Sequence, residues 1–457
     1  MKRRWIDPLR WLVPGLGVKR WLMVALIGIL LLLDAVDRYI VAEGFRLHVN
    51  EVLDSAVADY FPPSFLTDIF GIIGIALVLT SAWMWTRALL RASRSLGQHG
   101  LMDTIRGARL RDGYKIVAVG GGTGLSTLLR GLKRSTSNLT AIVTVSDDGG
   151  SSGRLQKELG VLPPGDVRNC LVALADDEAL VTELFRFRFE EGEGLSGHSF
   201  GNLFLAAMTG ITGNFDRAIK ESSRVLNVVG RVLPATLGVV RLCATLRDGT
   251  TVEGESKIGS PHAPIERLYF DPPYAAALDE TIAAIRDADA IVLGPGSLFT
   301  SILPNLLVDR IAQEIAAAPG LKLYVCNVMT QPGETDAMTA ADHVEALLAH
   351  AGTHVCDYVL VNSAPPQRLR ELYAEEGQTP VAPDVARIEA LGMTVVQAQM
   401  ISETQTVRHD SQRLADNVIG IIDRAVAERA SFVRPATYYS HAAGAPSRKP
   451  TVRSTPP

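Results

Sequence analysis

Residues 115–155 read KIVAVGGGTGLSTLLRGLKRSTSNLTAIVTVSDDGGSSGRL. An apolar, β-branched run at 116–119 enters a glycine cluster at 120–124, which is followed by a helix-prone segment at 125–132 and a second apolar run at 140–145. Strand, glycine loop, helix and strand form half of a mononucleotide-binding unit. The glycines let the backbone approach a phosphate, and the helix start offers unpaired N–H groups and the positive end of its dipole. The stretch therefore predicts a nucleotide-binding α/β domain.

The spacing of the glycines narrows the class of ligand. A dinucleotide-binding loop has the pattern GxGxxG with an acid about 20 residues later. Here Gly120, Gly122 and Gly124 are spaced GxGxG, and no Gly-Lys-Ser/Thr sequence follows as a P-loop requires. We expect Gly121, Gly122, Thr123 and Gly124 to hold a phosphate, with a hydroxyl donor from Thr123. A tight turn that only packs the helix on the sheet is the alternative.

The second apolar run ends in the motif DDGGSSGR. Its carboxylates, Asp147 and Asp148, fall at the edge of a parallel sheet where ligands bind. Two acids there suit hydrogen bonds to a ribose or base, or a divalent metal such as Mg²⁺ beside a phosphate. Ser151 and Ser152 add hydroxyl groups, and Arg154 can pair with a phosphate. A solvated turn would use the same residue types.

Two further motifs lie before expected helix starts in the first half of the domain, LPPGDVRN and GHSFGNL. In the first, Asp166 is the natural N-cap, and a ligand-binding role for Asn169 is equally open. In the second, His198 or Ser199 could cap the helix, while Asn202 could reach a base or sugar. His198 as a general base is the weaker hypothesis, because no partner acid is identifiable in the sequence.

Two loops in the second half repeat the pattern of an apolar strand followed by polar residues. LGPGSLFTS follows a strand expected at 290–293, and its flexible turn before a helix start predicts a second anion-binding loop. NVMTQPGET follows a strand expected at 321–326, so its polar side chains also fall at a strand exit. The candidate ligand-binding residues of these loops are Gly294, Gly296, Ser297, Asn327 and Thr330.

Between residues 114 and 430, strand-like runs alternate with longer helical patterns. This alternation predicts a Rossmann-like α/β domain with a mostly parallel sheet and helices on both faces. We expect residues 96–113 to form a basic linker, and residues 431–457, rich in Pro, Ser and Ala, to be a disordered tail.

The composition excludes some classes of protein. The chain has 457 residues and a net charge of −4, which argues against a nucleic acid partner. Its four cysteines form no CxxC pair, so we expect buried free thiols in a reducing compartment.

Residues 1–95 predict a transmembrane hairpin with spans at about 21–36 and 69–86. An apolar helix needs roughly 17–25 residues to cross a membrane, which the second run provides and the first reaches marginally. Basic residues flank both outer ends, and the connecting loop is acidic. The positive-inside rule then predicts a multi-pass cell-membrane protein with both termini and the main domain cytoplasmic. A cleaved signal peptide and a buried core hairpin are the alternatives.

Six motifs in order resemble those of one family. GGGTGLSTLLRGLK, TVSDDGGSSGRL, LPPGDVRN, GNLFLAAM, LGPGSLFTSILPNLL and NVMTQPGET are similar to those of the YvcK-like proteins, called gluconeogenesis factors, in the superfamily of 2-phospho-L-lactate transferase. The resemblance covers about residues 114–430. It implies a domain that binds a UDP-sugar such as UDP-N-acetylglucosamine, with a role in cell shape, envelope synthesis and gluconeogenic growth and no established reaction.

The resemblance also implies a layout of the site. The glycine loop around Thr123 would hold a diphosphate, Asp147 and Asp148 would lie beside it, and Asn202 would contact the nucleotide. In the transferase branch, a nucleoside diphosphate–lactate donates phospholactate to a deazaflavin with a magnesium ion.

Three hypotheses follow. The first is a membrane-anchored UDP-sugar-binding regulator, with envelope-synthesis proteins and a second copy of the chain as expected partners. The second is a magnesium-dependent phospholactate-type transferase. The third, an NAD-dependent oxidoreductase, is disfavoured by the glycine spacing.

Overall fold

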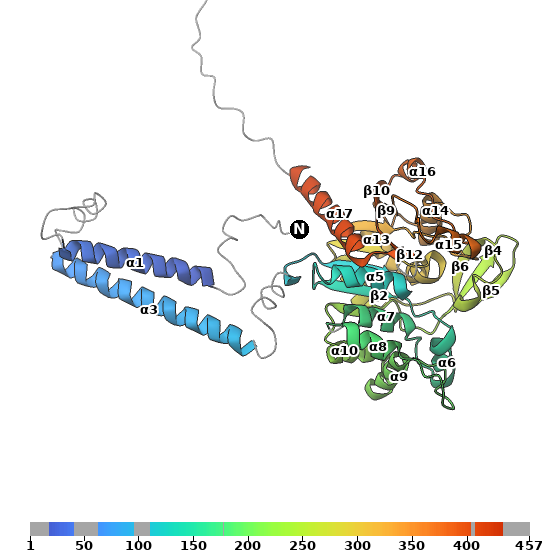
Figure 1. Ribbon diagram of the computed structural model, residues 1–457, viewed down its shortest axis with the longest axis horizontal. Helices are drawn as coiled ribbons and strands as arrows, with labels where there is room; N and C mark the ends of the chain where they lie inside the picture. The colour runs from blue at the N-terminus through green and yellow to red at the C-terminus, as the bar shows by residue number, and fades with distance from the viewer. Residues whose placement is uncertain (1–17, 41–62, 96–109, 177, 404–406, 433–457) are drawn as a thin grey trace, which may run out of the picture. The chain divides into compact units, whose positions relative to one another are not determined.

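The computed structural model describes residues 18–40, 63–95, 110–176, 178–403 and 407–432 (Figure 1). The chain divides into two compact units, Met1–Asp112 and Gly113–Pro457. Most of the predicted linker at 96–113 and of the predicted tail at 431–457 lies outside the described residues.

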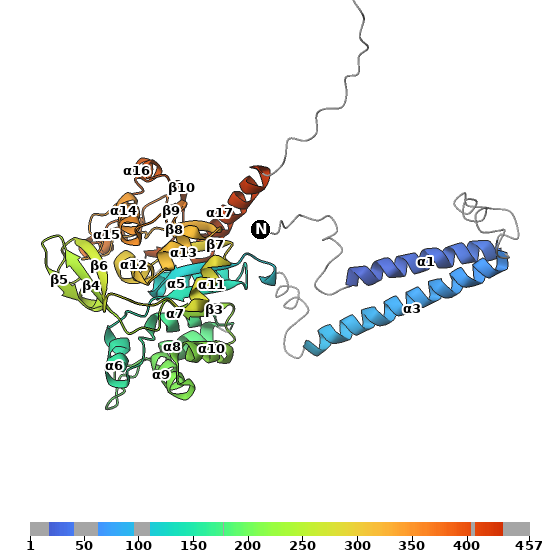
Figure 2. The same cartoon turned by 180° about the vertical axis from the view of Figure 1, so that it is seen from behind.

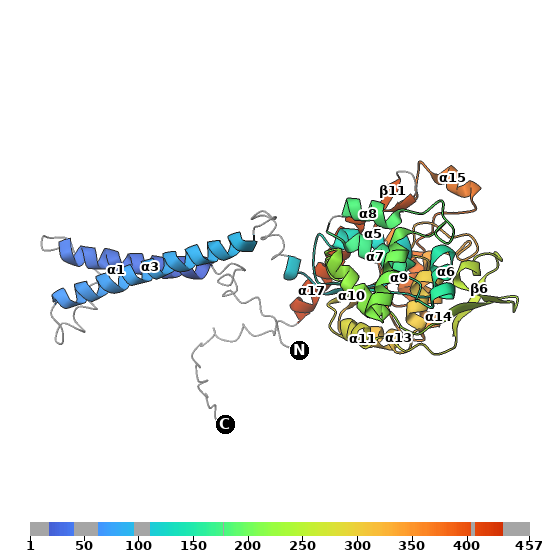
Figure 3. The same ribbon diagram turned by 90° about the horizontal axis from the view of Figure 1, so that it is seen from below.

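The first unit contains two long helices, α1 (Val18–Ile40) and α3 (Pro63–Ser95), which lie side by side (Figure 3). Glycines allow their close approach, because a Cβ at Gly74 would lie 2.9 Å from the carbonyl oxygen of Gly28. Across the described residues, no helix has both the length and the apolar character needed to cross a membrane. This finding contradicts the two spans predicted at 21–36 and 69–86, and with them the predicted cell-membrane localisation.

The second unit is built on a seven-stranded sheet with the order β10-β9-β8-β7-β1-β2-β3. Every neighbouring pair is parallel, which confirms the predicted α/β fold. Every residue of β1, β2 and β7 is buried, as expected of parallel strands covered on both faces. The strands are β1 (Ile116–Gly120), β2 (Leu139–Val143), β3 (Arg231–Pro234), β7 (Ala290–Leu293), β8 (Leu321–Val325), β9 (Tyr358–Asn362) and β10 (Thr394–Ala398).

Helices cover both faces of the sheet (Figures 1 and 2). Successive residues of β1 enter opposite cores: Val117 and Val119 belong to one cluster of buried side chains, and Ile116 and Ala118 to the other. The main helices are α5 (Gly122–Leu132), α6 (Gly150–Leu159), α7 (Gly165–Leu174), α8 (Glu178–Arg186), α9 (Phe200–Thr212), α10 (Phe215–Val225), α11 (Asp279–Arg286), α12 (Leu303–Leu307), α13 (Ile311–Ala317), α14 (Ala340–Ala351), α15 (Arg370–Glu375), α16 (Val385–Ala390) and α17 (Ser411–Phe432). All four cysteines are buried free thiols.

Two small antiparallel sheets interrupt the alternation and were not predicted. One contains β4 (Arg241–Leu246), β5 (Thr251–Glu253) and β6 (Ile265–Asp271), and the other pairs β11 (Ile401–Glu403) with β12 (Val407–His409). Both bring residues from distant parts of the sequence toward the edge of the main sheet described next.

Candidate functional site

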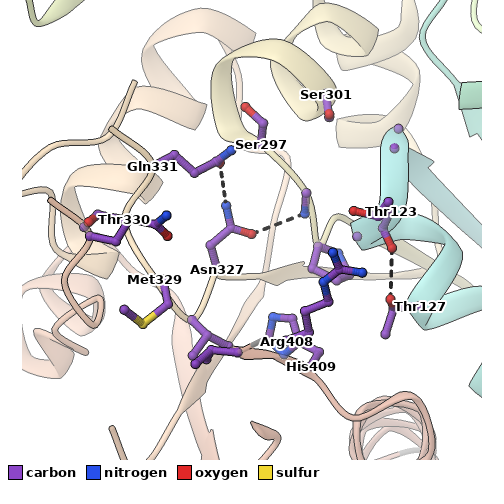
Figure 4. Close-up of a pocket in the computed structure, with 18 of the residues that line it drawn as sticks. Thr123, Thr127, Ser297, Ser301, Asn327, Met329, Thr330, Gln331, Arg408 and His409 are labelled. Carbon is purple, nitrogen blue, oxygen red and sulfur yellow. Dashed lines mark hydrogen bonds between the residues drawn. The ribbon is translucent and has the colours of Figure 1, made fainter. Parts of the chain in front are cut away.

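The strand order reverses between β1 and β7. From β1 the chain builds outward through β2 to β3, and from β7 it builds the other way through β8 and β9 to β10. Ligands of open α/β sheets bind at such a switch point, beyond the carboxyl ends of the strands. The chain has a cavity of about 440 Å³ there, lined by the loops after β1, β7 and β8 (Figure 4). The predicted residues that line it are Gly121, Gly122, Thr123, Gly124, Gly296, Ser297, Asn327 and Thr330.

The loop after β1 presents an open helix end to this cavity. Gly121 is the N-cap of α5 and, as a glycine, has no side chain to cap the helix, while the carboxyl group of Asp166 bonds the Gly122 N–H. Gly122 has φ +62°, a conformation that favours glycine. The first N–H groups of a helix have no partner within it, so they and the helix dipole attract an anion. The Thr123 side chain lies at the same wall of the cavity.

The loop after β7 packs directly against the glycine loop. A Cβ at Gly124 would lie 2.5 Å from the Pro295 carbonyl oxygen, so only glycine fits there. Gly294 does not line the cavity. It has φ +79°, and a Cβ there would lie 3.1 Å from the Val325 carbonyl oxygen, so glycine allows the two backbones to approach closely. The loop leads into η3 (Leu298–Ile302), a π-helical turn.

The loop after β8 contributes amide groups. Asn327 accepts a hydrogen bond from the Gly296 N–H at 3.3 Å and donates one to Gln331 at 3.2 Å (Figure 4). The Thr330 N–H donates to the Thr379 carbonyl at 2.8 Å, which fixes the base of this loop. These contacts fix the polar side chains that line this part of the cavity.

The cavity residues missed in the sequence include Tyr373, Gln378, Val407, Arg408 and His409. Arg408 is exposed on β12, and its side chain extends into the cavity toward the side of Thr123 (Figure 4). Within the described residues, no carboxylate forms an ion pair with Arg408. Tyr373 holds β12 in place, because its hydroxyl accepts a hydrogen bond from the Val407 N–H at 3.0 Å. No local motif marks these residues. Arg408 and His409 come from β12, whereas Tyr373 and Gln378 come from α15 and the loop after it.

The remaining predicted residues form a second group beside the cavity: Asp147, Asp148, Ser151, Ser152, Arg154, Asn169, His198 and Asn202. At its centre, the Ser151 hydroxyl bonds His198 Nδ1 at 2.9 Å and accepts a hydrogen bond from Asn202 at 3.1 Å. Arg168, also missed, donates to Asn202 at 2.9 Å and to Asn169 at 3.0 Å. Burial lowers the pKa of His198, which favours the neutral ring. This network joins α6, α7 and α9.

Two members of this group have other partners. Asn202 also donates to the Ser152 hydroxyl at 3.4 Å. Arg154 donates to the Ser196 carbonyl oxygen at 2.9 Å, so the predicted phosphate partner bonds the backbone before α9.

Acidic side chains connect the second group with the glycine loop. Asp147 accepts the Gly149 N–H at 2.9 Å, and Asp148 accepts the Ser256 N–H at 2.9 Å. Asp166 lies against Gly121, where a Cβ would come within 2.2 Å of its carboxylate. Asp166 belongs to the first turn of α7, whose N-cap is Pro164, so the prediction that it is the N-cap is wrong.

Burial changes the protonation of two of these acids. It raises the pKa of Asp166 to about 7, with a further rise from the charge of Asp147, while the Gly122 N–H and Arg168 oppose it. Burial also raises the pKa of Glu255 to about 8, helped by the charge of Asp147. Carboxylates of this kind suit Mg²⁺, but among the described residues no three His, Cys, Asp or Glu side chains converge as a metal site. The magnesium role of Asp147 and Asp148 stays a prediction.

A parallel sheet with a glycine loop at its switch point defines a Rossmann-like α/β domain. Comparison with known proteins names the family. The family model of 2-phospho-L-lactate transferase CofD matches residues 116–401. The chain belongs to this family and, within it, to the gluconeogenesis factors, as the sequence motifs predicted.

The similarity extends over most of the chain. It is 47% identical over 416 residues to a putative gluconeogenesis factor of Nostoc sp. PCC 7120, covering 89% of this chain and 91% of that protein. It is 51% identical over 310 residues to the gluconeogenesis factor of Bacillus subtilis, covering 67% and 98%. A crystal structure of a UPF0052 family member from Bacillus halodurans aligns with a TM-score of 0.65 at 49% identity, covering 67% of this chain and 99% of that one.

Proposed function

We propose that this chain binds a UDP-sugar, such as UDP-N-acetylglucosamine, in the cavity between the loops after β1 and β7. In this role it would regulate cell shape, envelope synthesis and growth on gluconeogenic carbon. The observation that carries the proposal is the glycine-rich start of α5, which faces a cavity of about 440 Å³ with Arg408 at its wall. Membership of the gluconeogenesis factors supports the physiological part.

Each wall of the cavity suits one part of such a ligand. The N–H groups of residues 122–124 and the Thr123 hydroxyl would hold the diphosphate. Arg408 would add a charge-assisted pair of hydrogen bonds to a phosphate, for which a guanidinium is well shaped. The amides of Asn327 and Gln331 would bond the polar edge of the base or the sugar hydroxyls.

Calorimetric titration of the whole chain with UDP-N-acetylglucosamine tests the proposal. Wild-type protein should bind, and Arg408→Ala should weaken binding by about tenfold or more, since a hydrogen bond to a charged group contributes about 1.5–3 kcal/mol. Arg424→Ala is the matched control: this exposed arginine on α17 bonds only a carbonyl of its own helix among the described residues. Absence of binding at millimolar ligand would reject the proposal.

A magnesium-dependent phospholactate-type transferase is the second candidate. It is favoured by the name of the matching family model and by the acids beside the glycine loop. Asp147 and Asp148 would hold the metal, which would neutralise phosphate charge during transfer. Incubation with nucleoside diphosphate–lactate, a deazaflavin and Mg²⁺ tests it, and a lack of product would discard this candidate. Envelope-synthesis proteins and a second copy of the chain stay predicted partners.

A further inference from the structure

Glu334 lies directly behind the loop after β7. Its carboxylate accepts a hydrogen bond from the Ser297 hydroxyl, and the Thr300 side chain also contributes to its environment. Burial raises the pKa of Glu334, and the hydrogen bond from Ser297 opposes that rise. Glu334 belongs to the loop before α14, so it links the loops after β7 and β8.

The Ser297 hydroxyl is fully used by these contacts. A hydroxyl has one proton and two acceptor positions. Ser297 Oγ accepts hydrogen bonds from the Thr300 N–H at 3.1 Å and from Thr300 Oγ1 at 2.7 Å. The single Ser297 proton is therefore directed to Glu334 and away from the cavity that Ser297 lines.

Two backbone donors of this loop also have partners. The Gly296 N–H donates to Asn327, and the Thr300 N–H donates to Ser297. A carboxylate behind the loop adds negative charge where a second phosphate site was predicted. The start of α5 differs, because its N-cap Gly121 has no side chain and the Asp166 carboxyl group bonds only the Gly122 N–H.

The cavity thus has two adjacent loops of the same sequence type, in direct contact at Gly124 and Pro295. The loop that holds the diphosphate decides the orientation of the ligand in the cavity. We propose that Glu334 is a specificity-determining residue: it closes the loop after β7 to anions by holding the Ser297 proton, and so confines the diphosphate to the glycine loop of α5. This inference rests on the proposed function and specifies the orientation of its ligand.

The substitution Glu334→Gln tests this role. It keeps the shape of the side chain, removes the charge, and supplies an N–H group that can replace the Thr300 hydroxyl as a donor to Ser297. The Ser297 proton is then free to turn toward the cavity. The whole chain and the variant are titrated with inorganic pyrophosphate and with UDP-N-acetylglucosamine. We expect pyrophosphate to bind the variant roughly threefold to tenfold more tightly, because the freed Ser297 hydroxyl can donate to a phosphate oxygen and one such hydrogen bond contributes about 0.5–1.5 kcal/mol. Damage to the fold would instead weaken binding.

Two variants serve as controls. Glu266→Gln alters an exposed carboxylate of β6 in the adjoining cavity of about 520 Å³, which Glu334 also lines, and should leave pyrophosphate affinity unchanged. Glu334→Gln combined with Ser297→Ala should lose the gain, because Glu334 acts through Ser297. Glu334→Ala removes the same charge and should also bind pyrophosphate more tightly, which keeps the test available if the glutamine variant does not fold.

The outcomes separate this inference from the proposed function. Equal or weaker pyrophosphate binding by both Glu334 variants would overturn the inference while UDP-N-acetylglucosamine binding by the wild type still stands. A gain that persists without the Ser297 hydroxyl would overturn the route through Ser297. Wild-type binding of pyrophosphate without UDP-N-acetylglucosamine would reject the UDP-sugar as ligand. The pyrophosphate affinities of the Glu334 variants would then decide the inference. Wild-type binding of neither ligand would reject both.

Discussion

The loops after β1 and β7 look alike in sequence and differ in how their helix starts are capped. Each follows a central strand, each has a glycine with positive φ, Gly122 at +62° and Gly294 at +79°, and each leads into a helix. The start of α5 has no side-chain cap, whereas Ser297 caps η3. On the proposed function, we expect a glycine-rich strand exit to serve as an anion site when no capping hydroxyl group occupies its first turn.

One buried side chain holds the two loops together. Asn305 is fully buried, and its amide donates to the Gly120 carbonyl at 3.1 Å and to the Ser301 carbonyl at 2.7 Å. Asn305 thereby joins the end of β1 to the turn that follows β7. The two loops form one rigid wall, so a change in their contact should alter both stability and binding.

The largest expected effect comes from Gly124→Ala. The new Cβ would lie 2.5 Å from the Pro295 carbonyl oxygen and 2.8 Å from Gly296 Cα, and backbone atoms cannot turn aside. We expect a loss of about 3 kcal/mol in the free energy of unfolding, at the upper end for overpacking, and loss of UDP-N-acetylglucosamine binding. Urea unfolding and calorimetry measure the two effects.

Gly210→Ala is the control for this substitution. Gly210 lies in α9, and a methyl group added there would meet no atom within 4 Å beyond its own helix backbone and chain neighbours. Alanine should therefore stabilise the protein by about 0.5–1 kcal/mol. Equal effects at Gly124 and Gly210 would contradict the direct contact of the two loops.

Asn305→Leu should have the next largest effect on stability. The leucine leaves the buried carbonyls of Gly120 and Ser301 without this donor, at a cost of about 1–3 kcal/mol. The Asn417→Leu variant changes a more exposed asparagine of α17 and should cost less than about 0.5 kcal/mol. Thermal unfolding measures both, and similar losses in the two variants would argue against the role of Asn305.

Asp166→Asn tests the acid beside the open loop. In the folded chain the pKa of Asp166 is raised to about 7 from an ordinary value of 3.8, so the folded state keeps a proton that the unfolded state loses first. Wild-type stability should therefore fall as the pH rises from about 4 to about 7. The asparagine variant cannot lose this stability, so its advantage over the wild type should grow by more than about 1 kcal/mol between pH 4 and pH 8.

Urea unfolding at the two pH values, in buffer without divalent cations, measures that difference. A stability difference between wild type and Asp166→Asn that does not change with pH would show that Asp166 titrates as an ordinary carboxyl group.

The smallest expected effect is that of Thr123→Val. Loss of one hydroxyl donor at the open loop should weaken UDP-N-acetylglucosamine binding by about fivefold, the equivalent of about 1 kcal/mol. Thr209→Val removes a hydroxyl that bonds a carbonyl of its own helix, α9, and should leave the affinity unchanged. Calorimetry compares the two variants, and equal affinities would remove Thr123 from the site.

The fold could be predicted where the residues that form an element are contiguous in the sequence. The strand, glycine loop and helix at 116–132 are contiguous, and the strand predicted at 290–293 matches β7. The difference between the two glycine loops could not be predicted, because Glu334 lies 37 residues from Ser297 in the sequence. Arg408 was missed for the same reason, since β11 and β12 carry it to the cavity only in the folded chain.

The sequence also grouped residues that the structure separates. His198 and Asn202 were expected in the ligand site, yet both are buried in the network that joins α6, α7 and α9. Polar residues near a helix start suit a ligand and a buried network equally well, so motif chemistry alone cannot distinguish these roles.

A crystal structure of the chain with bound UDP-N-acetylglucosamine tests the central claim most directly. We predict that the diphosphate lies against the N–H groups of residues 122–124, with Arg408 in contact with a phosphate oxygen. A diphosphate bound at Gly296 and Thr300, or a nucleotide bound outside this cavity, would contradict the account.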